Sequence, residues 1–248
     1  MKRIPVRIHV GIVMRSLLVQ AAWNYRTMIG CGMAFALLPL RRYLGRTPEG
    51  VDRVDLEVHA AHFNAHPYLT SAALGSLARM EVEDTPRETV VRFRDAVKGP
   101  LGALGDRLVW AAWLPFCSVL SLGVLWAGAP EWAAVLVFLG MYNAGHAFLR
   151  VKGYLLGWAE GPRLGMRLRQ SGIPGLARRV ERLLMVALGL MVGVLAASGV
   201  PEGAGTDLHL PGALALGAGA LLGPRAWKPA AVVVVGAVAL VLVIGLLR

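Results

Sequence analysis

The sequence predicts an all-α integral membrane protein, with about five transmembrane helices preceded by an amphipathic N-terminal half. Hydrophobic residues make up 56% of the 248 residues and charged residues only 17%, whereas soluble domains average about 25% charged residues. Charge-free strings long enough to cross a bilayer follow one another after residue 107. Because a basic surface domain would not carry such strings, the net charge of +11 does not indicate a nucleic-acid partner.

The N-terminal arm is predicted to be retained and to lie at a membrane surface. Arg7 and Arg15 interrupt the apolar run that a signal peptide would need. Ile12–Arg26 is predicted to be an interfacial helix, on which Gln20 and Asn24 stand one turn apart on the same face.

Two more helical segments are predicted in residues 1–107, the amphipathic first region. The 14 uncharged residues between Arg26 and Arg41 are too few for a spanning helix and indicate a re-entrant or interfacial segment. Asp52–Met80 is predicted to be a helix broken at His66-Pro67, because proline disfavours helical geometry at the residue before it.

Residues 108–248 form the second predicted region, which crosses the membrane several times. Its five charge-free strings have 23, 18, 18, 17 and 18 residues: Leu108–Pro130, Trp132–Leu149, Leu183–Val200, Leu208–Pro224 and Ala230–Leu247. Each approaches or reaches the length of a spanning helix. The basic segment 150–182, between the second and third strings, is predicted to be cytoplasmic.

The distribution of Lys and Arg predicts the orientation. Residues 1–107 hold 15 of the 26 basic residues and 150–182 hold eight, whereas the connections at 128–131 and 201–209 hold none. Since Lys and Arg accumulate in cytoplasmic loops, we expect a cytoplasmic N-terminus and a C-terminus outside. We also expect the basic residues to bind membrane lipids.

Three histidines have a spacing that could hold zinc on one helical face. His59, His62 and His66 lie at i, i+3 and i+7. However, no acidic or cysteine side chain is obviously placed to act as a further ligand, and Pro67 distorts the last turn. We therefore expect no metal and no cofactor.

The string Lys98–Asp106 has a glycine at every third position from Gly99. Without the Gly-Lys-Ser/Thr ending, it is not a phosphate loop. One interpretation is a flexible turn that leads into a membrane helix. The other is a broken helix at membrane depth, whose exposed backbone groups bind a polar solute or a partner's loop.

Further along, polar and small residues occur where helices would pack. Tyr142, Asn143 and His146 lie within the second charge-free string and are interpreted either as packing residues or as the lining of a solute path. Gly153 and Gly157 have the spacing that allows helix backbones to approach closely.

Four strings occur together in the order of a known family. They are RSLLVQAAWNYR at Arg15–Arg26, HFNAHPY at His62–Tyr68, KGPLGALGD at Lys98–Asp106 and GYLLG at Gly153–Gly157. They resemble the R-x-x-x-x-Q-x-x-W-N-Y-E-R, F-N-T-H-P-Y, K-x-x-x-G-P-L-A-G-I-G-D and G-Y-x-x-G strings of the IID membrane component of the mannose/fructose/sorbose-type bacterial sugar phosphotransferase system.

The resemblance implies a subunit that forms a sugar translocation unit with a IIC membrane subunit, in trimers of IIC–IID pairs in the bacterial cytoplasmic (inner) membrane. Cytoplasmic IIA and IIB proteins would pass phosphate from phosphoenolpyruvate to a hexose-type sugar. The chain itself would then carry no catalytic or phosphorylated residue. One alternative is a transport-inactive scaffold or regulatory subunit that binds a IIC-like partner. Another is a metal-dependent membrane enzyme that uses the three histidines.

The resembling strings also suggest site residues. We expect the substrate path to contain Gln20, Asn24, Asn64, His66 and Asp106, whose polar groups can pair with sugar hydroxyls. The residues expected to shape these strings are Trp23, Pro67, Tyr68, Gly99, Pro100, Gly102 and Gly105.

Overall fold

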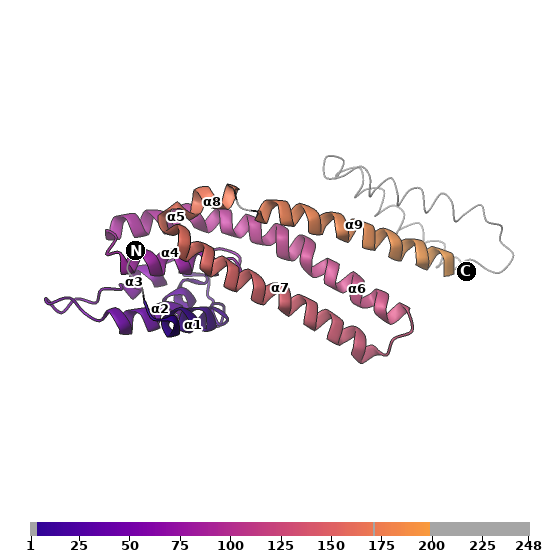
Figure 1. Cartoon of the computed structure of the whole chain (residues 1–248), viewed down its shortest axis with the longest axis horizontal. Coiled ribbons are helices and arrows are strands. Elements are labelled where there is room, and N and C mark those ends of the chain that lie inside the picture. The colour runs from indigo at the N-terminus through magenta and orange to yellow at the C-terminus, as the bar shows by residue number, and fades with distance from the viewer. Residues whose placement is uncertain (1–3, 171, 199–248) are drawn as a thin grey trace. The chain divides into compact units, whose positions relative to one another are not determined.

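The computed structural model describes residues 4–170 and 172–198, and this part of the chain is helical without a β-strand (Figure 1). The α-helices are α1 (Val6–Ser16), α2 (Gly30–Leu44), α3 (Leu56–Ala60), α4 (Thr70–Val82), α5 (Arg87–Gly105), α6 (Leu114–Trp126), α7 (Glu131–Glu160), α8 (Leu164–Gln170) and α9 (Ile173–Ser198). A π-helix, η1 (Asp106–Trp113), joins α5 to α6, and a 3-10 turn, η2 (Gly161–Arg163), joins α7 to α8. The predicted helical class is confirmed for the described residues.

Two helical segments in the described part of the chain are long and apolar enough to cross a membrane. They are Arg87–Trp126, with 40 residues, and Glu131–Leu168, with 38 residues. They contain most of the first two predicted strings. The third string begins within α9, and the last two lie outside the described residues. The count of five spans therefore stays a prediction.

The described chain forms two compact units. The first contains the chain up to Val109 together with Asn143–Pro174, and the second contains Trp110–Tyr142 together with the chain from Gly175. The predicted division between residues 107 and 108 stays a prediction. In the second unit, α6 and the start of α7 form a hairpin, in which Ser121 Oγ donates a hydrogen bond of 2.6 Å to the Ala134 carbonyl.

An apolar cavity of about 710 Å³ lies in the second unit. It is lined by Val119, Leu120, Leu122, Gly123, Leu125 and Trp126 of α6 and by Ala187, Leu190 and Met191 of α9. Almost all of these side chains are aliphatic, so the cavity lacks the paired donors and acceptors that a sugar would need.

Helix α4 is the centre of the first unit, with 11 of its 13 residues buried. It crosses the C-terminal part of α7 at very short range: a Cβ on Gly75 would overlap the α7 backbone, and one on Gly157 would overlap the Ala72 carbonyl. Ser76 Oγ donates to the Gly157 carbonyl at 3.0 Å. Gly153 also faces α4, so the predicted close approach at Gly153 and Gly157 is confirmed.

The predicted helix Ile12–Arg26 is wrong, because α1 ends at Ser16 and a series of turns follows. Asn24 is one local cause. Its Oδ1 accepts hydrogen bonds from the backbone N–H groups of Arg26, at 3.0 Å, and Thr27, at 2.9 Å. Such side-chain bonds offer the backbone an alternative to the helix. Gln20 and Asn24 therefore do not share a helical face.

The helix predicted over Asp52–Met80 is interrupted over a longer stretch than expected. Helix α3 has only five residues, and α4 begins at Thr70. The intervening loop pairs with the segment before α2, since Phe63 N donates to the Thr27 carbonyl at 3.1 Å and Ile29 N to the Phe63 carbonyl at 3.2 Å. The uncharged stretch between Arg26 and Arg41 forms most of α2.

Candidate functional site

Two of the motif strings meet in the first unit, where the loop of residues 62–68 lies against one face of α5. A Cβ on Gly105 would overlap the side chain of His66. A Cβ on Gly102 would lie 3.7 Å from Ala65 Cα and 4.0 Å from the Asn64 carbonyl oxygen. The two glycines are three residues apart and so share the helical face that meets the loop. Of the two, Gly105 alone requires the absence of a side chain, because a Cβ on Gly102 would make an ordinary van der Waals contact.

Both predicted forms of Lys98–Asp106, a flexible turn and a broken helix, are wrong. The string is helical throughout: α5 continues to Gly105 with Pro100 inside it, and η1 begins at Asp106 without a break. Gly105 is used for close packing, and the contact with the 62–68 loop favours helical geometry in a segment whose composition does not. The departure from regular α-helical hydrogen bonding lies instead in η1, and π-helical segments occur frequently at functional sites.

Next to this contact, three rings and a guanidinium form what we call the Tyr68 cluster: His66, Tyr68, His146 and Arg150. The Tyr68 ring stacks on His146 with centroids 3.9 Å apart, and it meets His66 edge-on at 5.1 Å. Arg150 Cζ lies 5.4 Å from the centre of the Tyr68 ring, within the range of a cation–π contact.

Arg150 is the buried charge of this cluster, with only 3% of its surface exposed. Its Nη1 donates to the carbonyl oxygen of Ser16 and, at 3.1 Å, to Ser16 Oγ, while its Nε donates to His146 Nε2. No carboxylate of a described residue pairs with it. Arg150 thus connects α7 to the end of α1 through uncharged acceptors.

His66 is buried, and its Nδ1 accepts a hydrogen bond of 3.2 Å from the Tyr68 N–H. Burial, followed by repulsion from Arg150 and then His146, lowers the pKa of His66 to about 4. A neutral imidazole at physiological pH can both donate and accept hydrogen bonds, as a sugar hydroxyl requires.

The remaining residues predicted for the substrate path lie in different environments. Asn64 and Asp106 are exposed, and each is adjacent to the contact between His66 and Gly105. Asp106 forms no ion pair with a described residue. Gln20 is exposed in the turns after α1. The Asn24 amide is occupied locally, since its Nδ2 donates to the Ala22 carbonyl at 3.1 Å and to Thr27 Oγ1 at 2.8 Å.

The residues predicted to shape the strings also separate into two groups. Pro67 and Tyr68 are buried in the 62–68 loop. Trp23 is exposed in the turns after α1, and Gly99 and Pro100 are exposed on the outer face of α5. The last two do not take part in the contact with the loop.

The three histidines of the hypothetical zinc site do not assemble. His59 is fully buried in α3, where it donates from Nε2 to Glu81 Oε1 at 2.7 Å, whereas His62 is exposed. His66 belongs to the Tyr68 cluster. Within residues 4–170 and 172–198, no group of three His, Cys, Asp or Glu side chains is placed to hold a metal ion.

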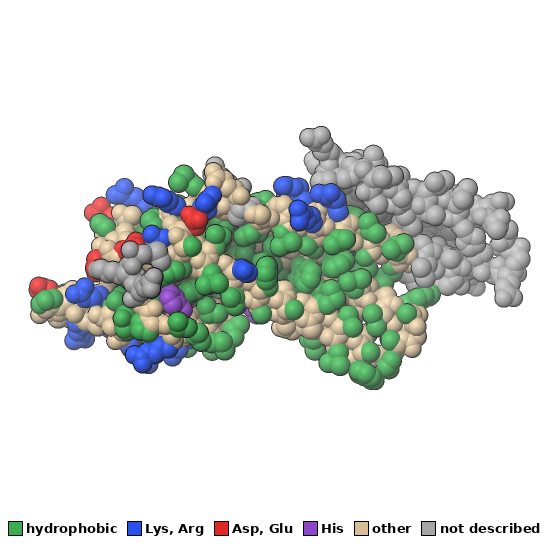
Figure 2. All heavy atoms as spheres, in the orientation of Figure 1, with side chains coloured by type: hydrophobic (Ala, Val, Ile, Leu, Met, Phe, Trp, Pro, Cys, Tyr) green, Lys and Arg blue, Asp and Glu red, His purple; other side chains and the backbone are tan. Residues whose placement is uncertain are grey.

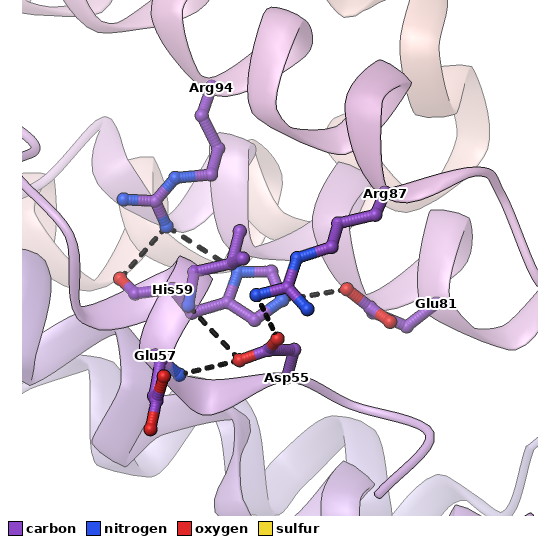
Figure 3. Close-up of polar contacts among 7 residues, drawn as sticks. Asp55, Glu57, His59, Glu81, Arg87 and Arg94 are labelled. Atoms are coloured by element: carbon purple, nitrogen blue, oxygen red, sulfur yellow. Dashed lines mark hydrogen bonds and ion pairs between the residues drawn. The ribbon is translucent and has the colours of Figure 1, made fainter. Parts of the chain in front are cut away.

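His59 instead belongs to a polar network that joins α3, α4 and α5 (Figure 3). Arg94 from α5 is buried and donates to the carbonyl oxygens of His59, at 2.8 Å, and Ala61, at 2.9 Å. Asp55 accepts from the first backbone N–H groups of α3 and pairs with Arg87. All of these groups have partners within the network, so its role is to fix the base of the 62–68 loop.

Arg150 lies at the start of the segment predicted to be basic and cytoplasmic, and it was not among the predicted site residues. Its position carried a signal, since it directly follows a charge-free string and stands one helical turn after His146. An arginine at that position can be buried when a polar residue one helical turn earlier, here His146, accepts a hydrogen bond from it.

Together these features define a helical membrane protein in which two motif strings meet beside a buried cluster of aromatic and basic side chains. A family model described as PTS system mannose/fructose/sorbose family IID component matches residues 7–202. The chain belongs to this family, as the four strings predicted.

Relatives of known name agree with this assignment. The chain is 24% identical over 156 residues to the PTS system mannose-specific EIID component of Escherichia coli (strain K12), covering 61% of this chain and 54% of that protein. It is 22% identical over 206 residues to the Fructose permease IID component of Bacillus subtilis (strain 168), covering 81% and 74%. The chain therefore spans about half the length of the mannose-specific relative that it matches.

Solved structures share the fold. One, described as "Structure of membrane protein", superposes with a TM-score of 0.68 at 22% identity over 77% of this chain and 71% of that chain. A second, described as "CryoEM Structure of Mannose Transporter ManYZ and Microcin E492 (MceA) complex", gives 0.58 at 21% identity over 78% and 72%. Family and fold confirm that the chain is a membrane protein.

Proposed function

We propose that this chain forms, with a IIC-type membrane subunit, the translocation unit of a mannose-family sugar phosphotransferase system. The observation that carries the proposal is the family match over residues 7–202, together with the contact between two of the family strings at His66 and Gly105. In this scheme IIA and IIB deliver phosphate from phosphoenolpyruvate to a hexose-type sugar, and the chain acts without a phosphorylated residue of its own. Trimers of IIC–IID pairs are the proposed assembly.

Within this unit, Asn64, His66 and Asp106 are the proposed sugar-path residues. Asn64 and His66 belong to the 62–68 loop that contacts α5, and Asp106 directly follows Gly105, which meets His66. The three side chains offer an amide, a neutral imidazole and a carboxylate. Sugar hydroxyls need donors and acceptors of this kind, because a buried polar group left unpaired costs about 1–3 kcal/mol. Gln20 remains a further candidate, and we assign Asn24 to holding its own loop.

The proposed location is the bacterial cytoplasmic membrane, with the N-terminus in the cytoplasm and the C-terminus outside. The support is the charge distribution, since residues 1–107 hold 15 of the 26 Lys and Arg residues. Basic residues accumulate on the cytoplasmic side of membrane proteins.

A pull-down of the tagged chain from native membranes in mild detergent, followed by mass spectrometry, tests the partnership. Recovery of a IIC-type protein in equal amount would support the translocation unit, and recovery of the chain alone or with unrelated proteins would contradict it. If IIC is recovered, phosphoenolpyruvate-dependent phosphorylation of mannose, fructose and sorbose is measured in membranes. Absence of that activity would favour the transport-inactive scaffold.

The site assignment is tested separately with Asp106→Asn in the same membranes. We expect sugar phosphorylation to fall while IIC is still recovered. Glu88→Gln is the matched control, because Glu88 is also an exposed carboxylate of the same helical segment. Equal activity of the two variants would remove Asp106 from the site.

A further inference from the structure

Helix α1 has two apolar faces, and the first unit covers only one of them. Ile8 and Ile12 point inward and are buried, Ile12 completely. Val6, Val10 and Met14 follow one another at steps of four residues on another face, and Val6 is 73% exposed. A helix that is apolar on both sides is normally covered on both sides, by protein or by lipid.

The turns after α1 extend this exposed apolar surface. Leu17 and Leu18 are exposed, and the rings of Trp23 and Tyr25 meet edge-on at 4.8 Å, with Tyr25 85% exposed. Tryptophan and tyrosine combine an apolar ring with a polar group, and they concentrate where hydrocarbon meets water at a membrane.

The charges around this surface have one sign. Residues 1–48 contain eight Lys and Arg and no Asp or Glu. Arg7, Arg26 and Arg42 are exposed, and none of them forms an ion pair with a described residue. In Figure 2, hydrophobic and basic side chains share the area where Figure 1 labels α1 and α2. We call this surface the N-terminal face: Val6, Val10, Met14, Trp23 and Tyr25 with the three arginines.

We propose that the N-terminal face is inserted into the headgroup region of a bilayer and selects anionic lipids. Apolar side chains beside aromatic rings and unpaired arginines are the composition of an interfacial anchor, which binds through buried apolar area and through attraction to anionic headgroups. The exposed rings of Trp23 and Tyr25 beside these basic residues favour lipid over a protein partner, because tryptophan and tyrosine concentrate where hydrocarbon meets water at a membrane. The inference goes beyond the proposed function, because lipid contact requires neither sugar nor IIC.

The test uses the full chain, with IIC where it co-purifies, in nanodiscs of phosphatidylcholine alone or mixed with phosphatidylglycerol. In a background with Cys31→Ala and Cys117→Ala, Met14→Cys carries a bimane label. Glu88→Cys, an exposed position on α5 outside the N-terminal face, is the matched control. Val10→Cys replaces Met14→Cys if that variant does not fold, as judged by thermal unfolding.

We expect nitroxide-labelled lipid to quench the label at residue 14 and aqueous iodide to quench the label at residue 88. At equal mole fraction, nitroxide phosphatidylglycerol should quench residue 14 about twofold more than nitroxide phosphatidylcholine. The combined change Arg7→Gln, Arg26→Gln and Arg42→Gln should remove this preference.

Three outcomes would overturn the proposal. Iodide quenching of residue 14 as strong as that of residue 88 would mean that the face lies in water. Protection from both quenchers would mean that protein covers it. Equal quenching by the two labelled lipids would refute the selection of anionic lipid. None of these results depends on sugar phosphorylation, so the proposed function stands or falls separately.

Discussion

Gly105 lies directly against His66, so closely that a side chain at residue 105 would occupy the space of the imidazole. This contact joins two strings that are separated by about forty residues in the sequence and fixes where the neutral histidine sits. Its neighbour Asp106 begins the π-helical segment, so this contact lies at the boundary between α5 and η1. The glycine is therefore a packing residue of the candidate site, and its absence of a side chain is what the site requires.

A first prediction concerns this glycine. Gly105→Ala should lower the free energy of unfolding by about 1–3 kcal/mol, because the added methyl group overpacks the site. Gly99→Ala in the same helix is the control. Nothing lies within 4 Å of a Cβ there, so it should be neutral or stabilise by about 0.5–1 kcal/mol. Thermal unfolding of both variants in detergent measures the difference, and equal stability of the two would contradict the contact.

A second prediction concerns the buried arginine. Arg150→Met should destabilise the chain by about 1–3 kcal/mol, because the carbonyl of Ser16 loses its buried donor. Lys152→Met, two residues further along the same helix and exposed, should change stability by less than about 0.5 kcal/mol. Denaturation monitored by tryptophan fluorescence compares the two. If both variants unfold alike, Arg150 does not connect α7 to α1 as described.

A third prediction tests the crossing of α4 and α7. Gly157→Ala should cost about 1–3 kcal/mol or prevent folding, since its Cβ would overlap the carbonyl of Ala72. Gly140→Ala lies in the same helix, where a Cβ has nothing within 4 Å. The yield of folded protein after size-exclusion chromatography and the unfolding temperature are the measurements. Tolerance of Gly157→Ala at the level of Gly140→Ala would argue against the crossing.

A fourth prediction is a pH dependence that comes from His66. Its pKa is lowered from 6.5 to about 4 in the folded chain, so folding favours the neutral form. The resulting stability is present above pH 6.5 and is lost progressively as the pH falls toward 4. The unfolding temperature of His66→Gln should therefore decline less between these pH values than that of the unchanged chain.

His9 provides the control for this dependence. Burial also lowers the pKa of His9, which lies 2.8 Å from Tyr154 Oη. His9→Gln should thus remove a separate part of the acid sensitivity and leave the part due to His66. An acid profile of His66→Gln that matches the unchanged chain would refute the prediction.

The sequence by itself determined the class and the family. Charge-free strings such as Leu108–Pro130 indicate a lipid environment directly. Lipid excludes unpaired charge, and a helix pairs its backbone N–H and C=O groups within itself. The four family strings could also be recognised from the sequence alone, since each is a short continuous segment and they occur in the family's order. These properties do not depend on which helix lies next to which.

The tertiary structure decided the form of the glycine-rich string and the members of the site. Lys98–Asp106 has the composition of a turn, yet Gly105 lets the 62–68 loop approach a continuous helix. Arg150 is typical of a cytoplasmic loop by composition, yet Ser16 and His146 hold it inside. Local sequence cannot settle such cases, because the contacts that stabilise them join residues up to 134 positions apart, and these contacts form only when the chain folds.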